Sequence, residues 1–206
     1  WKLKILGVVM KLELFNGPTS PFGRMTKVAG IELGLDFKET VIDVYNATFL
    51  DQWNPLRQIP TLLVDDTQPI FDSLNICLFF DSLSTTNSLF SENDFLHKTR
   101  VALAIGIMEA GLSRQMEIIR SDHEKSLTHI RKMEDRMSRA LDYLESNASN
   151  STENTISMAQ IATACALEYT SFRWSDDWKN SRPKLAAWLA TFSRRDSMIS
   201  SYPCTK

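Results

Sequence analysis

The first third of the chain alternates short apolar stretches with a helical repeat, as small mixed domains do. Residues 11–15 alternate polar and apolar side chains and break at Asn16-Gly17-Pro18, which indicates a strand entering a loop. After Pro21, apolar residues recur at helical spacing as far as Leu33, and Gly34 provides a stop. The pattern predicts a strand, a loop and a helix in this order.

Five further segments complete this domain. Their patterns predict a strand over residues 37–44, a turn or short helix over 46–54, a hairpin of 61–64 with 68–71, and a helix over 73–83. The resulting order, βαβαββα, is that of a thioredoxin-like α+β domain.

The rest of the chain has only helical patterns. Residues 83–91 are rich in Ser, Thr and Asn, which indicates a linker. Helices are predicted over 94–120 and 127–144, then from a capping box at Ser157, and last from Pro183. The apolar face of the second of these helices is expected to start at Leu127.

The domain boundaries follow from these patterns. We expect an extension left by cloning over 1–9, ahead of a natural start at Met10, and a thioredoxin-like domain over 10–83. A linker over 84–93 then leads to an all-helical bundle over 94–206.

Composition excludes several kinds of function. The 206 residues carry 23 basic and 25 acidic side chains without a long block of one sign, so a nucleic-acid partner is not expected. No apolar stretch approaches the roughly 18 residues of a membrane span. Three cysteines without a CxxC pair favour a reducing, cytoplasmic location. His97, His123 and His129 have no metal-ligand spacing, so no metal is expected, and all three are expected at the surface.

Three motifs then appear in order: Thr19-Ser20-Pro21-Phe22, the run NPLRQIPTL over residues 54–62, and Phe71-Asp72-Ser73. They resemble the glutathione-site series of bacterial glutathione S-transferases. The helical half is also similar, through residues 106–110, the Ser157 helix and Arg182-Pro183. The resemblance covers about residues 10–203. It implies a cytosolic enzyme, typical of detoxification, that joins glutathione to a small electrophile.

The resemblance implies a catalytic role for Ser20. Conjugation needs the thiolate of glutathione, and a hydroxyl beside the free amides of a helix start can stabilise that anion. Thr19 is the competing candidate for this hydrogen bond. On spacing alone, a plain helix cap is the favoured interpretation of Ser20.

The resemblance also implies residues that bind the rest of glutathione. Ile59-Pro60 resembles the family's cis-proline turn, which pairs with the tripeptide backbone. Gln58 stands where the family commonly has lysine, so a charged contact is weakened there. Asp72 and Ser73 are expected to take the γ-glutamyl end, the alternative again being a helix cap.

Second-substrate residues are expected on the first loop and the long helix after the linker. They are Thr19, Phe22, Ile107, Met108 and Met116, for which ordinary core positions are the alternative. Glu117 and Arg120 are interpreted as a solvated helical ion pair.

Two other functions compete with a transferase. One is a non-catalytic module that binds glutathione, another ligand or a protein, since fold does not fix function. The other is a glutathione-dependent thiol-disulfide oxidoreductase, which requires a cysteine near Ser20, where none occurs; Cys77 is interpreted as structural. The resemblance also implies a homodimer, with Phe79 and Phe90 as apolar residues expected at the surface.

Overall fold

The computed structural model describes residues 2–5, 8–91, 93–148 and 155–203. They form two compact units. The first contains the described residues up to Ser91 together with those from Asp196 onward, and the second runs from Asn93 to Arg195. The chain therefore returns to the first unit after completing the second.

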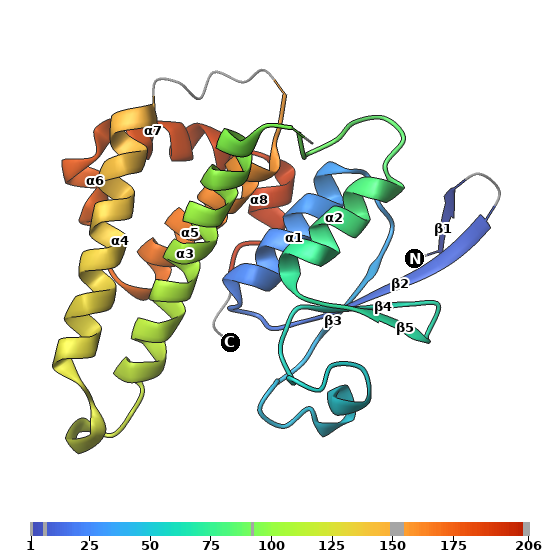
Figure 1. Ribbon diagram of the computed structural model, residues 1–206, viewed down its shortest axis with the longest axis horizontal. Coiled ribbons are helices and arrows are strands. Elements are labelled where there is room, and N and C mark those ends of the chain that lie inside the picture. Colours follow the sequence, from blue (N-terminus) through green and yellow to red (C-terminus); the bar gives the residue numbers. More distant parts are fainter. Residues whose placement is uncertain (1, 6–7, 92, 149–154, 204–206) are drawn as a thin grey trace. The chain divides into compact units, whose positions relative to one another are not determined.

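The first unit is built on a mixed sheet in which four strands follow the order β3, β2, β4, β5 (Figure 1). A fifth strand, β1, is the first in the sequence. β3 runs parallel to β2, whereas β4 is antiparallel to both β2 and β5. β1 pairs antiparallel with the beginning of β2. The bounds are Lys2–Ile5 for β1, Val8–Asn16 for β2, Lys38–Val41 for β3, Thr61–Val64 for β4 and Gln68–Ile70 for β5.

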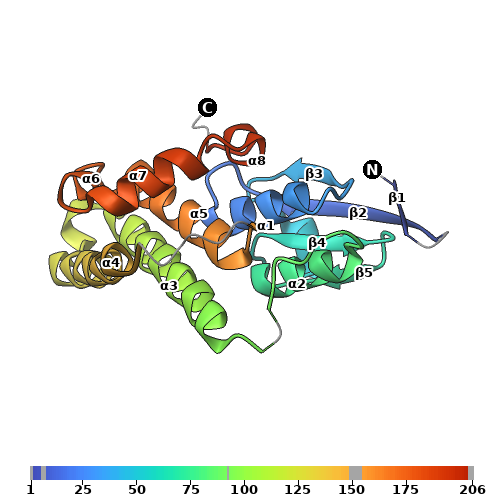
Figure 2. The same ribbon diagram turned by 90° about the horizontal axis from the view of Figure 1, so that it is seen from above.

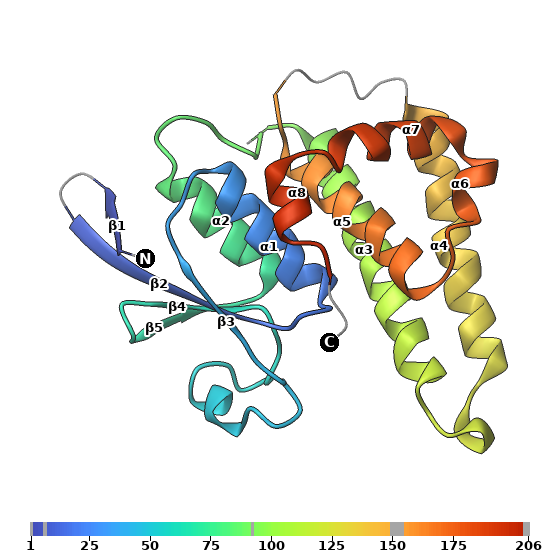
Figure 3. The ribbon, with the colours of Figure 1, turned by 180° about the vertical axis from the view of Figure 1, so that it is seen from behind.

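Two helices, α1 (Pro21–Glu32) and α2 (Ser73–Leu83), lie side by side on one face of this sheet (Figures 1 and 3). Period-two alternation directs the buried Leu12 and Leu14 of β2 to that face. Phe15 points to the opposite face, where it packs with Leu50 of the 3₁₀ helix η1 (Thr48–Gln52). The sheet thus has a buried core on each side.

The described part of the second unit consists of helices and the loops that connect them (Figure 2). Helix α3 packs against both α4 and α5, and every residue from Ile161 to Thr170 of α5 is buried. This confirms α5 as a central helix. The bounds are Phe95–Ile118 for α3, Asp122–Glu124 for the 3₁₀ helix η2, Leu127–Asn147 for α4, Met158–Arg173 for α5, Trp178–Ser181 for α6 and Pro183–Phe192 for α7.

The predicted fold class is confirmed: a mixed-sheet domain of the thioredoxin-like order is followed by a helical domain. Local stop and start signals account for the helix ends. Gly34 takes a φ of 68°, the left-handed conformation that ends α1, and the Ser157–Gln160 capping box begins α5.

Several features differ from the sequence-based expectation. β2 begins at Val8 and pairs with β1, so strand structure extends into the first nine residues. The short helices α6 and α8 (Asp196–Ser200) were not predicted, and α8 lies in the first unit rather than with the bundle.

Two predictions about exposure were wrong. His97 is 5% exposed, because its spacing to Val101 and Ala104 places it on the buried face of α3. Leu127 is 63% exposed; as the first residue of α4 it lies almost one turn before Ile130, the first buried residue.

Candidate functional site

Strand register brings the three sequence motifs to one end of the sheet. Phe15 at the end of β2 pairs with Thr61 at the start of β4, and Leu62 pairs with Ile70 at the end of β5. The loop after β2, the turn before β4 and the segment after β5 therefore leave the sheet at the same end. These are the segments that hold Ser20, Pro60 and Asp72.

Ser20 is the N-cap of α1. Its Oγ accepts a hydrogen bond of 3.1 Å from the amide of Gly23, and its own amide donates to the carbonyl of Gly17 over 3.2 Å. The cap interpretation is thus confirmed. Thr19 lies in the turn just before it, and both side chains are half-buried. No acidic side chain lies in the first turn of α1, so its amide dipoles are not neutralised from within the turn.

The Ile59–Pro60 peptide bond is cis, as the resemblance implied. Pro60 is buried, Gln58 is exposed, and the side chain of Ile59 packs against the core beneath the sheet. Among the described residues, the backbone of Ile59 makes no hydrogen bond. The N–H and C=O of Ile59 are therefore available to pair with an added strand.

A buried asparagine organises this turn. Asn54 is 1% exposed, and its Nδ2 donates to the carbonyl of Gln58 over 3.1 Å and to Thr61 Oγ1 over 3.0 Å. Its Oδ1 accepts from the amide of Leu56. The sequence alone assigns Asn54 no role, although it opens the NPLRQIPTL motif, because only the folded loop shows which atoms its amide joins.

Gln58 stands where the resemblance implies a lysine, and the residue before it, Arg57, is basic. The adjacent guanidinium, that of Arg57, forms two hydrogen bonds to the carboxylate of Asp51. These bonds hold the pKa of Asp51 below its ordinary value. Arg57 is thus paired with Asp51, a residue of the 3₁₀ helix η1.

Asp72 and Ser73 begin α2. Asp72 is its N-cap, and Oδ1 accepts hydrogen bonds from the amides of Leu74 and Asn75, at 3.1 and 3.2 Å. The cap interpretation is confirmed here too. Both bonds use the same carboxylate oxygen, and Asp72 is exposed, whereas Ser73 is 7% exposed.

The expected second-substrate residues differ in exposure. Phe22 is half-buried, Ile107 and Met108 are 1% and 0% exposed, and Met116 is 39% exposed. The burial of Ile107 and Met108 agrees with the core alternative stated for them.

The expected helical ion pair of Glu117 with Arg120 is present, but Glu117 itself is not solvated. It is buried, and its Oε1 accepts a 2.5 Å hydrogen bond from the amide of Ser126, the N-cap of α4. Arg120 contacts the other oxygen at 3.5 Å. The Ser126 amide is the main reason why the pKa of Glu117 lies below its ordinary value.

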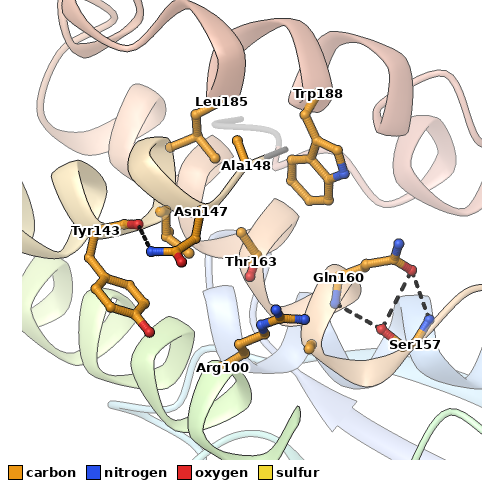
Figure 4. Close-up of a pocket in the computed structure, with 11 residues that line it drawn as sticks. Arg100, Tyr143, Asn147, Ala148, Ser157, Gln160, Thr163, Leu185 and Trp188 are labelled. Carbon is orange, nitrogen blue, oxygen red and sulfur yellow. Dashed lines mark hydrogen bonds between the residues drawn. The ribbon is translucent and has the colours of Figure 1, made fainter. Parts of the chain in front are cut away.

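A small hollow in the second unit does not coincide with the predicted site (Figure 4). Arg100, Tyr143, Gln160 and Trp188 are among the side chains around it, and its volume is about 50 Å³. Because small-molecule sites typically measure about 300 Å³ or more, it is too small for a tripeptide.

Within the described parts of the chain, no group of three His, Cys, Asp or Glu side chains is placed to bind a metal ion. Nor is any described helix long and apolar enough to cross a membrane.

This chain has a thioredoxin-like sheet, with the three motif-bearing turns at one end of it, followed by a helical bundle. These features define the class of two-domain glutathione S-transferase folds. The family model for the glutathione S-transferase N-terminal domain matches residues 19–83, and that for the C-terminal domain matches residues 127–191. A GST-like protein of Escherichia coli K12, YibF, described as uncharacterized, is 30% identical over 93% of this chain and 98% of its own length. The chain therefore belongs to the glutathione S-transferase family.

Solved structures agree. A glutathione transferase family member from Pseudomonas fluorescens Pf-5, crystallised with bound glutathione, is 32% identical, with a TM-score of 0.87 over 95% of this chain and 100% of its own. A glutathione S-transferase from Methylobacillus flagellatus KT, also with glutathione bound, is 25% identical, with a TM-score of 0.88 over 94% of this chain and 100% of its own.

Proposed function

We propose that this protein is a glutathione transferase that joins the thiolate of glutathione to a small electrophile. The observation that best supports this proposal is the hydrogen bonding of the Ser20 hydroxyl. The cap uses one acceptor lone pair of Oγ, whereas the hydroxyl proton takes no part in it. Ser20 can therefore cap α1 and donate to a sulfur anion at the same time.

Each end of the tripeptide has a partner in this proposal. The backbone of Ile59, unpaired among the described residues, takes the peptide backbone of glutathione like an added strand. The second oxygen of Asp72 faces the γ-glutamyl ammonium, and Ser73 with the first amides of α2 takes the carboxylate. Gln58 gives a weaker contact than lysine. Thr19 and Phe22 are the first-unit residues proposed to face the second substrate.

The reaction needs the thiol proton to leave before attack. A thiol pKa near 8.5 must fall by about two units for the anion to predominate at neutral pH, which requires about 2.7 kcal/mol of preferential stabilisation of the thiolate. The proton passes to solvent, and the sulfur forms a bond to the electrophilic carbon as the leaving group departs with its electron pair. Ser20 donates a hydrogen bond throughout and forms no covalent bond.

The test combines binding and turnover. Glutathione binding is measured by calorimetry, and conjugation is measured with 1-chloro-2,4-dinitrobenzene as a generic aromatic electrophile. We expect Ser20→Ala to bind glutathione but to lose about a hundredfold in kcat, as loss of one donor to a developing anion typically does. Thr19→Ala is the competing variant, and Ser146→Ala, at an exposed position of α4, is the control. A larger loss for Thr19→Ala would transfer the role to Thr19.

A non-catalytic glutathione carrier is the second candidate, favoured by the neutral Gln58. Binding without turnover in the wild-type protein would establish it, and absence of binding would refute both proposals. A thiol-disulfide oxidoreductase has less support. Cys77 and Cys165 are buried in helices, and neither lies near Ser20 in the sequence. Cys204 lies outside the described residues.

We also propose a cytosolic homodimer. Its support is a group of exposed apolar side chains on the connector between β3 and β4, with Tyr45 69% and Leu56 65% exposed, and Val41 and Phe49 beside them in sequence. Phe79 and Phe90, expected at the surface, are half-buried and contribute less. Light scattering should give twice the 23.5 kDa chain mass, and Leu56→Asp should reduce it. A monomeric wild-type mass would refute this assembly.

A further inference from the structure

We propose that Asn16 is a positioning residue for the Ser20 hydroxyl, an inference that rests on the proposed function and names a residue that controls the same site. Asn16 is the last residue of β2 and is 4% exposed. It does not contact glutathione in this proposal. It acts through the two glycines that hold Ser20.

Two of the three hydrogen bonds made by Ser20 involve a glycine next to the Asn16 side chain; the third, from the Arg24 amide to the Ser20 carbonyl over 3.0 Å, is the first backbone bond of α1. The Ser20 amide donates to the carbonyl of Gly17, whose own amide donates to Asn16 Oδ1 over 2.8 Å. The Ser20 Oγ accepts from the amide of Gly23, and Gly23 lies directly against the Asn16 amide group. Displacement of Asn16 therefore disturbs both of these glycine-linked hydrogen bonds, including the one to the Ser20 hydroxyl.

The contact with Gly23 is too close for any other residue. A Cβ at position 23 would lie 1.5 Å from Asn16 Oδ1 and 2.4 Å from its Cγ. Glycine thus lets the end of β2 touch the first turn of α1. The separation between strand end and helix start, and with it the location of Ser20, is set by this contact.

The orientation of the Asn16 amide is fixed from the other side. Its Nδ2 donates to Glu39 Oε1 over 2.8 Å, while Lys27 Nζ contacts Glu39 Oε2 at 2.6 Å. Glu39 belongs to β3 and Lys27 to α1, so the network joins three elements. Because Glu39 is an acceptor on one side of Asn16 and the Gly17 amide is a donor on the other, only one orientation of the Asn16 amide satisfies both.

This network permits a test by exchange of donor and acceptor. Asn16→Asp keeps an acceptor for the Gly17 amide but turns a carboxylate oxygen toward Glu39, where two like charges repel. Adding Glu39→Gln restores a donor toward position 16 and leaves an oxygen for Lys27. The double variant should therefore recover what the single variant loses. Asn180→Asp, which introduces the same charge at an exposed position of the second unit, is the matched control.

The first readout does not depend on catalysis. Amide hydrogen exchange in the protein without glutathione should be about tenfold faster at Ser20 and Gly23 in Asn16→Asp, and near wild-type in the double variant. Unchanged exchange in Asn16→Asp, or equal acceleration in the double variant, would overturn the inference whether or not the protein is a transferase.

The second readout concerns the site. We expect Asn16→Asp to raise the pH at which bound glutathione ionises and to lower kcat about tenfold with little change in KM for glutathione, because the Ile59 and Asp72 segments are untouched. If wild-type protein fails to bind glutathione, the proposed function fails while the exchange result still judges Asn16. If wild-type protein is active and Asn16→Asp matches it in pH profile and kcat, the positioning role is refuted.

Discussion

The attachment of the C-terminal segment to α1 leads to a prediction about stability. Arg24, on the second turn of α1, is 5% exposed and reaches residues that follow the helical domain. Its Nε donates to Ser201 Oγ over 3.2 Å and its Nη2 donates to the carbonyl of Met198 over 3.1 Å. The guanidinium also lies 5.3 Å from the centre of the Tyr202 ring. Arg24→Met removes both hydrogen bonds and keeps an apolar stem of similar length.

The expected loss follows from what each partner retains. Hydrogen bonds from a charged donor typically contribute about 1.5–3 kcal/mol each. After the substitution, however, Ser201 Oγ still donates to the Met198 carbonyl over 3.4 Å, so neither partner atom is left without a hydrogen bond. Arg24→Met also removes the cost of burying the guanidinium charge, which offsets a further part of the loss in stability. We therefore expect Arg24→Met to lower the free energy of unfolding by about 2 kcal/mol, below the sum of about 3–6 kcal/mol for two such bonds.

Urea unfolding followed by circular dichroism measures this loss, and a second variant tests its origin. Ser201→Ala removes one partner and should cost about 1 kcal/mol. Because both substitutions remove the same bond, the double variant should lose about 1 kcal/mol less than the sum of the singles. Arg131→Met, at an exposed position of α4, should change stability by less than about 0.5 kcal/mol. The reasoning is refuted if Arg24→Met matches that control, or if its effect adds fully to that of Ser201→Ala.

Three further predictions concern the helical unit and the cysteines. Ser157→Ala should cost about 1 kcal/mol in the same urea assay, because it removes one half of the capping box; no loss would show that the box is dispensable. Because the pKa of Glu117 is lowered, its carboxylate binds a proton less readily in the native state than in the unfolded state. The hydrogen bond from the Ser126 amide therefore adds to the free energy of unfolding above the ordinary pKa of 4.5, and this contribution is lost as the pH falls below that value. Urea midpoints from about pH 6 to pH 3 should therefore fall less steeply in Glu117→Gln than in wild type, and parallel curves would contradict this. Cys77 and Cys165, both buried, should react with a thiol reagent only in urea, and rapid labelling of either in native protein would show that its helix opens.

Local signals allowed most helix ends to be predicted from the sequence. Ser20, Asp72 and Ser157 each cap the helix that their type and position indicated. Such signals act over three or four residues, so they need no knowledge of the rest of the fold. By contrast, α8 has a weak local pattern, and its contacts with α1 involve residues far apart in sequence, such as Arg24 and Met198.

The exposure of single polar residues was harder to predict than the elements that carry them. His97 was expected at the surface because of its residue type, although its helical spacing from Val101 already placed it on a buried face. Asn54 and Asn16 stand at the ends of motifs that were recognised, yet their roles depend on which backbone amides and carbonyls fold around them. Sequence patterns predict faces and ends, whereas side-chain amides bridge loops in ways that only tertiary contacts define.

The sequence presented helix capping and ligand binding as alternatives at both Ser20 and Asp72, and in the proposed function the capping role assists the binding role. A hydroxyl that accepts from Gly23 is held in place while its proton stays available, and a carboxylate that caps α2 through one oxygen keeps the second. In each case the cap restrains a short side chain at the point where the helix amides converge. A donor fixed before the ligand arrives needs no reorganisation when the anion forms, which is the condition for stabilising a thiolate more than a thiol. Thr19 makes no such bond to α1 among the described residues, which is the structural reason to favour Ser20.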